Sequence, residues 1–271
     1  MLHAGRSPNR VTPAPRRCAV ALAILLALTA LIPTAWPARA AGPTAGDHSV
    51  YLPLVRGAPG LVPGLPFDPY ATRSGQATFY AADGGGSCSF DPSPTNLMVG
   101  AMNRTDYHAS LLCGAYVQIT GPKATIVVRI VDQCPECPAG NIDLSREAFA
   151  QIADPIEGRV PITWRLVSPD LAGPIVYHFK DGSSKWWLAV QIRNHRNPVW
   201  SVEFRDADGV FKRLERQDYN YFIQPDGLPG PVPESLTLRV GDIYGHVLVD
   251  SGIPLIAESE TPGSAQLPPM P

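Results

Sequence analysis

Short apolar runs that alternate with polar residues recur along the chain from about residue 75 onward. These runs are rich in Val, Ile, Thr and Tyr, and clusters of Gly, Pro, Asn and Asp separate them. Such a pattern is typical of β-strands joined by turns, because successive side chains of a strand point to opposite faces. The predicted strands lie at 76–80, 97–102, 115–119, 125–131, 160–167, 175–179, 186–193, 200–204, 235–240 and 246–249.

One segment has helical spacing instead. Ser145 can cap the N-terminus of a short helix. The inward face of that helix would hold Ala148, Phe149 and Ile152, and the helix would end before Pro155. With 30 prolines and 24 glycines in 271 residues, the chain favours many turns and few long helices, so we expect a mainly β protein.

The pattern divides the chain into parts of different character. Residues 1–40 hold several arginines, an apolar run of about fifteen residues and a small-residue cleavage site, and they predict a signal peptide for secretion. The run is shorter than the roughly twenty residues that span a bilayer, so we expect no membrane association after cleavage; a retained anchor is the alternative. Residues 41–70 read as an extended linker rich in Pro and Gly.

Two blocks of β-pattern follow, at 71–168 and 169–257, and each is long enough for its own core. Residues 258–271 are mainly Pro, Ser, Glu and Gly, and we expect them to be disordered. The formal net charge of −2 leaves no basic patch for a phosphate backbone, so nucleic acid is not an expected partner. Adsorption to an uncharged polymer would depend on stacking and hydrogen bonds.

Four cysteines follow the predicted signal peptide, an even number that predicts two disulfides in an oxidising compartment. They are Cys88, Cys113, Cys134 and Cys137, and from the sequence all three pairings are open. The CxxC pair at 134–137 also permits a zinc knuckle or a redox dithiol. A zinc site requires a second ligand pair and a redox pair a βαβ context, so we expect no metal and no cofactor.

Three carboxylates lie within a dozen residues, between the strand at 125–131 and the helix. They are Asp132, Glu136 and Asp143. Glycoside hydrolysis uses two carboxylates at a defined separation, which a sequence does not give. Asp143 also precedes the first helical turn, where it could simply stabilise the helix dipole. Both interpretations stay open at this point.

The second block has a cluster of aromatic residues whose faces could stack on pyranose rings. Trp186 and Trp187 begin the strand predicted at 186–193, and Trp200 and Tyr219 follow. Regular alternation along that strand buries Trp186 and exposes Trp187. Both rings could face a ligand only if the strand begins after Trp186 or bulges there.

Together these stretches resemble the bacterial expansins. In the first block the resemblance lies in Ala-Thr-Phe-Tyr at 77–80, Asp-Gln-Cys-Pro-Glu at 132–136 and Ile-Asp-Leu-Ser at 142–145. In the second it lies in Gly-Ser-Ser-Lys-Trp-Trp at 182–187, Gln-Ile-Arg-Asn-His at 191–195 and Asp-Tyr-Asn at 218–220. The match covers nearly all of 75–257 in the same order. It implies a six-stranded double-psi β-barrel, related to family-45 endoglucanases, followed by an immunoglobulin-like β-sandwich that binds carbohydrate.

The resemblance also implies roles for residues. Asp143 would be the acid that wall loosening requires, in a groove lined by Thr78, Tyr80, Asp132 and Glu136. A planar glucan-binding row would comprise Trp186, Trp187 and Tyr219, with Lys180 beside it, and this favours an exposed Trp186. Related barrels pair the cysteines at the positions of Cys88 and Cys113, which would leave Cys134 for Cys137. The chain departs from the family pattern at Cys134, where the groove often has an aromatic residue.

The activity that the resemblance implies is non-hydrolytic loosening of cellulose or a related cell-wall glucan by a secreted monomer. The protein would then not be a hydrolytic enzyme, because the family's barrel resembles an endoglucanase that has lost its catalytic base. One alternative is an active glycoside hydrolase or lytic transglycosylase that uses Asp143 as general acid on β-glucan or peptidoglycan. The other is an inert carbohydrate-binding or adhesion module.

Overall fold

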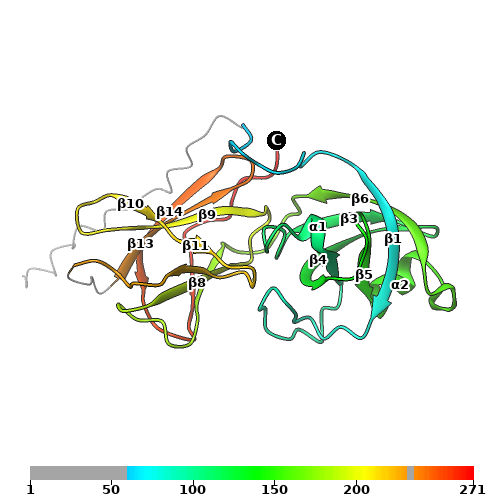
Figure 1. The fold of residues 1–271 in the computed structure, drawn as a ribbon, viewed down its shortest axis with the longest axis horizontal. Coiled ribbons are helices and arrows are strands. Elements are labelled where there is room, and N and C mark those ends of the chain that lie inside the picture. Colours follow the sequence, from blue (N-terminus) through cyan, green and yellow to red (C-terminus); the bar gives the residue numbers. More distant parts are fainter. Residues whose placement is uncertain (1–59, 231–234) are drawn as a thin grey trace, which may run out of the picture. The chain divides into compact units, whose positions relative to one another are not determined.

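The computed structural model describes residues 60–230 and 235–271 (Figure 1). The predicted signal peptide and most of the predicted linker lie outside these residues. No helix in the described ranges is long and apolar enough to cross a membrane. The chain is mainly β, as the alternating pattern predicted, and it forms a barrel followed by a sandwich of two sheets.

Six strands close the barrel in the order β1-β5-β2-β4-β3-β6. β1 pairs in parallel with β5, and β2 with β4, whereas the other neighbours are antiparallel. The pattern of β6 shows why these segments are strands, since every second residue from Val160 to Leu166 is buried. The strands are β1 (Arg73–Tyr80), β2 (Val99–Asn103), β3 (Tyr116–Thr120), β4 (Thr125–Cys134), β5 (Ile142–Ser145) and β6 (Val160–Val167).

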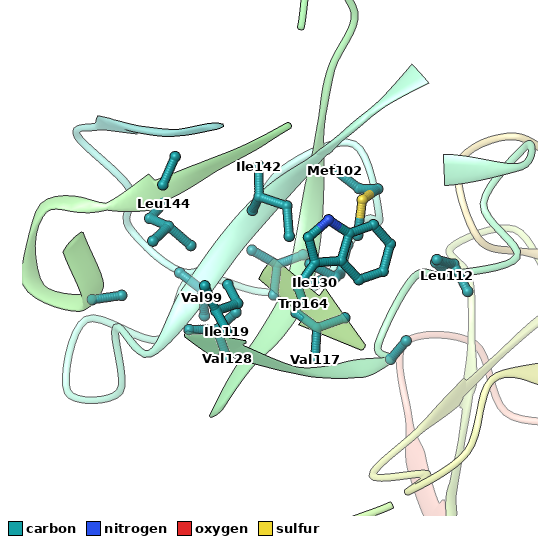
Figure 2. Close-up of a cluster of buried hydrophobic side chains, with 14 of the residues drawn as sticks. Val99, Met102, Leu112, Val117, Ile119, Val128, Ile130, Ile142, Leu144 and Trp164 are labelled. Carbon is teal, nitrogen blue, oxygen red and sulfur yellow. The ribbon is translucent and has the colours of Figure 1, made fainter. Parts of the chain in front are cut away.

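The barrel interior is filled by aliphatic side chains around one indole. Figure 2 shows Trp164 of β6 among side chains that include Met102 and Ile142. The indole nitrogen donates a hydrogen bond of 2.8 Å to the carbonyl of Gly140, so this polar group is satisfied inside the core. The barrel therefore has a packed centre, and ligands can reach only its outer surface.

Helix α2 (Arg146–Ile152) confirms the predicted helix. The Ser145 hydroxyl accepts a hydrogen bond from the amide of Ala148, and the three predicted inward residues are buried. The 3₁₀ turn η1 (Pro155–Glu157) follows. Helix α1 (Arg104–Tyr107) was not predicted, because four residues are too few to show a periodic pattern.

The sandwich consists of a four-stranded and a five-stranded antiparallel sheet with a shared apolar core. The first has the order β10 (Phe211–Arg213), β9 (Val199–Arg205), β13 (Ser235–Asp242) and β14 (Val247–Pro254). The second has the order β11 (Glu215–Arg216), β12 (Phe222–Gln224), β8 (Leu188–Arg193), β7 (Val176–Phe179) and β15 (Glu260–Pro262). The strands that sequence reasoning missed, β5, β10, β11, β12 and β15, have two to four residues each.

The prediction that residues 258–271 are disordered is wrong. β15 pairs with β7, which would otherwise leave a row of unpaired backbone groups at the sheet edge. Leu267, at 1% exposure, belongs to the sandwich core. Pairing with β7, the buried leucine and side-chain hydrogen bonds such as that of Gln266 to the carbonyl of Asn194 thus order a segment whose composition is polar.

The end of the predicted linker also differs from an extended spacer. Residues 60–70 contain no strand or helix, but Leu65 and Phe67 pack against the barrel core. The Phe67 ring stacks on His108 with centroids 4.7 Å apart, and the amide of Val62 donates to the carbonyl of Ile243. Widely spaced apolar residues therefore fix this stretch to the folded protein.

Candidate functional site

Two carboxylates lie in one row that crosses four neighbouring strands of the barrel. Thr78 of β1 is opposite Asp143 of β5, and Asp143 is opposite Ala101 of β2. Ala101 is in turn opposite Asp132 of β4. Residues opposite each other in a sheet point to the same face, so the row places both acids on one side of the barrel wall. Neighbouring strands lie about 4.8 Å apart, which puts the Cα atoms of the two acids roughly 10 Å apart.

Asp143 is half-buried and is held by a hydrogen bond from Thr78. The Thr78 hydroxyl donates to Asp143 Oδ1 over 2.5 Å. Burial raises the pKa of Asp143, and the negative charges of Glu136 and Asp132 raise it further, while the Thr78 bond opposes the shift. The carboxyl group therefore keeps its proton to a higher pH than an ordinary aspartate. Its side chain bonds to Thr78, and the residue that caps α2 is Ser145.

Tyr80 and Asp132 complete the polar face of this row. Tyr80 is two residues beyond Thr78 on β1 and so lies on the same face. Its buried hydroxyl has no hydrogen-bond partner among the described residues. Burial raises its pKa, as do the charges of Asp132 and Asp143. Asp132 accepts a hydrogen bond of 2.7 Å from the amide of Ser87, which fixes the carboxylate against the preceding glycine-rich loop.

The disulfides are Cys88–Cys113 and Cys134–Cys137, the pairing that the resemblance implied. The second closes a tight turn in which the amide of Cys137 donates to the carbonyl of Cys134. Glu136 is exposed within that turn. The CxxC pair thus forms a disulfide, and the turn that it closes carries Glu136, whose charge raises the pKa of Asp143.

The aromatic residues of the sandwich differ in exposure. Strand β8 begins only at Leu188, so Trp186 and Trp187 precede the regular alternation. Trp186 is 74% exposed, and Trp187 is half-buried. The prediction from alternation that Trp186 is buried is therefore wrong. Its side chain is exposed, as the resemblance implied. The ammonium group of Lys185 lies 4.5 Å from the centre of a Trp186 ring.

Tyr219 and Lys180 both lie near Tyr221, a residue that the sequence analysis did not single out. The Tyr219 ring lies 5.9 Å from that of Tyr221, and the Lys180 ammonium lies 5.2 Å from the Tyr221 ring. Tyr221 is two positions after Tyr219, and this spacing was the available signal. Trp200 is not part of this group, because it packs against the barrel core.

Residues 72–164 match the family model described as lytic transglycolase. Over 209 residues the chain is 36% identical to Expansin-YoaJ of Bacillus subtilis, which covers 73% of this chain and 85% of that protein. It is 33% identical to Expansin-like protein 2 of Dictyostelium discoideum over 64% of this chain and 44% of that protein.

Two solved structures have the same fold over most of the described residues. The apo expansin of Clavibacter michiganensis has a TM-score of 0.67 and 31% identity, and the match covers 72% of this chain and 98% of that one. A variant of that expansin in complex with cellohexaose has a TM-score of 0.67 and 30% identity over the same shares.

Proposed function

The chain belongs to the expansin family, and from this premise we propose that it is secreted, binds cellulose or a related cell-wall glucan and loosens the wall without hydrolysis. Asp143 would act as the loosening acid, in a groove lined by Thr78, Tyr80, Asp132 and Glu136. Trp186, Trp187 and Tyr219, with Lys180 beside them, would hold the glucan on the sandwich. We further propose that the protein acts as a monomer.

The observation that carries this proposal is the environment of Asp143. A half-buried carboxyl group with a raised pKa can donate a proton or a hydrogen bond at mildly acidic pH. Thr78 fixes its orientation, and Ala101 leaves a small side chain between it and Asp132. A glucan chain held there would meet one donating group in a fixed position, and that group would compete with its hydrogen bonds to neighbouring chains.

The aromatic side chains of the sandwich support glucan as the ligand. An indole face can cover the apolar face of a sugar ring, and Trp186 is the most exposed of the large apolar residues in the sandwich. The related Clavibacter protein, whose structure with cellohexaose is known, makes a β-linked glucan the first ligand to test. A panel of insoluble cellulose, xylan, mixed-linkage glucan, chitin and peptidoglycan would identify the natural polymer.

The test of the proposal is Asp143→Asn. This substitution keeps the shape of the side chain but removes the titratable proton, so extension of a stretched wall under load should fall sharply. Cellulose binding should stay near that of the parent protein, because the sandwich carries it. Asp208→Asn, at an exposed turn, is the matched control and should change neither property. Full loosening by a folded Asp143→Asn protein would contradict the role of Asp143.

A lytic activity is the second candidate. Asp143 and Asp132 lie on one face of the barrel wall, and glycosidases use two carboxyl groups that flank the scissile bond. The family model that matches the barrel is described as lytic transglycolase. Sensitive assays for new reducing ends from glucan and for anhydro-muropeptides from peptidoglycan decide between the candidates, since non-hydrolytic loosening produces neither.

Secretion has its own test. The sequence of residues 1–40 and the two disulfides both fit export to an oxidising compartment. Expression with the native N-terminus should yield extracellular protein that begins near Ala41, and N-terminal sequencing measures this directly. Intact residues 1–40 on a membrane-bound product would support the retained-anchor alternative.

A further inference from the structure

The loop that carries Tyr219 receives hydrogen bonds from the barrel. It connects β11 and β12 and consists of residues 217–221. The Ser110 hydroxyl donates to the carbonyl of Gln217 over 2.6 Å, and the Tyr107 hydroxyl donates to the carbonyl of Asp218 over 2.9 Å. In the reverse direction, the Asn220 side chain donates to the carbonyl of Cys88 over 3.2 Å. Three of the five loop residues, Gln217, Asp218 and Asn220, are thus hydrogen-bonded to barrel residues.

The barrel side of these contacts is buried and lies beside a disulfide. Tyr107 and Ser110 are buried, and the Tyr107 hydroxyl lies 3.1 Å from the sulfur of Cys113 in the disulfide to Cys88. His108, Ala109 and Ser110 all have left-handed backbone angles. Non-glycine residues hold such angles only where the surrounding contacts impose them. The disulfide and this turn therefore form a preformed cradle for the loop.

The barrel segment at Ser87 and Cys88, which the disulfide joins to Cys113, also contacts the groove. The amide of Ser87 donates to Asp132, and the next residue, Cys88, accepts hydrogen bonds from Asn220 and from Gln191 of β8. Gln191 is fully buried, and its 2.9 Å bond to Cys88 adds a second fixed point. Two consecutive residues thus connect the carboxylate of the groove to the loop that carries the aromatic ring.

We propose that Tyr107 and Asn220 are positioning residues that hold the Tyr219 ring in register with the groove of Asp143. The inference rests on the proposed function, in which a glucan contacts both places. If the ring is fixed relative to the groove, a long glucan can contact both without ordering the loop at each binding event. A glucan too short to reach both places gains less from this alignment. Chain-length selectivity therefore measures the positioning.

The experiment compares two buried tyrosines in the full chain. Tyr107→Phe removes the hydroxyl that binds the loop, and the control Tyr177→Phe removes a buried hydroxyl that binds Asp250 within the sandwich. Calorimetric titration with cellotriose and cellohexaose gives both affinities. For Tyr107→Phe we expect the affinity for cellohexaose to fall about fivefold, the size of effect for one lost hydrogen bond. The loss for cellotriose should be smaller.

Tyr177→Phe should lower the melting temperature and leave the ratio of the two affinities unchanged. An equal loss for both oligosaccharides in Tyr107→Phe, or no loss, would overturn the inference. Asn220→Gly is the second variant and should give the same change in selectivity. Asn220 has a φ of 65°, which glycine adopts without strain, so this substitution removes the side-chain donor without straining the backbone.

Hydrogen–deuterium exchange separates this inference from the proposed function. The amide of Asn220 is bonded within its loop, and it should exchange faster in Tyr107→Phe but at the parent rate in Tyr177→Phe. If the parent protein binds no cello-oligosaccharide, the proposed function is wrong. The proposed alignment of the Tyr219 ring and the Asp143 groove along one glucan is then wrong as well. The exchange rates then decide whether the barrel holds the loop, and parent-like rates in Tyr107→Phe would refute that as well.

Discussion

The Thr78 hydroxyl on β1 donates a hydrogen bond to the Asp143 carboxyl group on β5, from the position directly opposite it in the barrel sheet. Thr78 orients the acid, while burial and the charges of Glu136 and Asp132 keep its pKa high. The balance of these effects sets the pH range in which the group can donate a proton.

Glu136→Gln should move the pH profile of wall loosening toward lower pH. The substitution removes a negative charge that raises the pKa of Asp143, so Asp143 would lose its proton at a lower pH. Wall extension measured from about pH 4 to pH 8 at constant ionic strength gives the midpoint of the fall. Asp208→Asn is the control. An unchanged midpoint in Glu136→Gln would show that another group governs the pH dependence.

Asp143→Asn should raise the free energy of unfolding at neutral pH and leave it unchanged well below the pKa of aspartate. A pKa that is raised in the folded state gives stability that is present below the unfolded pKa and lost as pH rises through the folded pKa. Asparagine is uncharged at every pH, so the variant does not lose this part of the free energy of unfolding. Urea unfolding at pH 3 and pH 7 measures the difference. A lower stability at neutral pH would indicate a structural role for the carboxylate.

Trp186→Ala and Trp187→Ala should each weaken cellulose binding about five- to tenfold, more than Trp200→Ala does. The first two remove a face that can stack on a sugar ring, whereas Trp200 packs on the barrel core. Adsorption isotherms on cellulose give the affinities, and thermal unfolding should show the larger loss of stability for Trp200→Ala. Parent-like binding by a Trp186, Trp187 and Tyr219 triple-alanine variant would place the site elsewhere.

Leu267→Ala should cost about 3 kcal/mol of stability, the usual cost of emptying a leucine site in a core. The control Ile256→Ala should cost much less, because that side chain is 57% exposed. Truncation after Ala257 removes β15 and Leu267 together, so a sandwich fragment for binding studies needs the chain to residue 271. Chemical denaturation of the three variants gives the ranking, and an unaffected truncation would contradict it.

Replacing Cys88 and Cys113 by alanine should destabilise the protein by about 3 kcal/mol, because that disulfide closes a separation of 25 residues. Replacing Cys134 and Cys137, three residues apart, should cost clearly less, because the closed loop is short. Mass spectrometry should find no free thiol in the mature parent protein. Equal losses for the two double variants would show that strain or packing outweighs loop closure.

Local patterns in the sequence were enough to predict many features. Alternation gave the longer strands, and Ser145 with its apolar neighbours gave helix α2, because these signals depend on residues within one or two turns of each other. The even cysteine count predicted two disulfides. The resemblance supplied their pairing, the barrel with its sandwich, and the exposure of Trp186.

Only the tertiary structure decided which distant residues share a face. The row from Thr78 through Asp143 and Ala101 to Asp132 depends on the register of four strands, and no local pattern encodes that register. The order of residues 258–271 comes from pairing with β7, whose open edge is invisible in the composition of the tail. Likewise, the anchoring of the Tyr219 loop joins residues more than a hundred positions apart, so only folding brings Tyr107 and Asp218 into hydrogen-bonding distance.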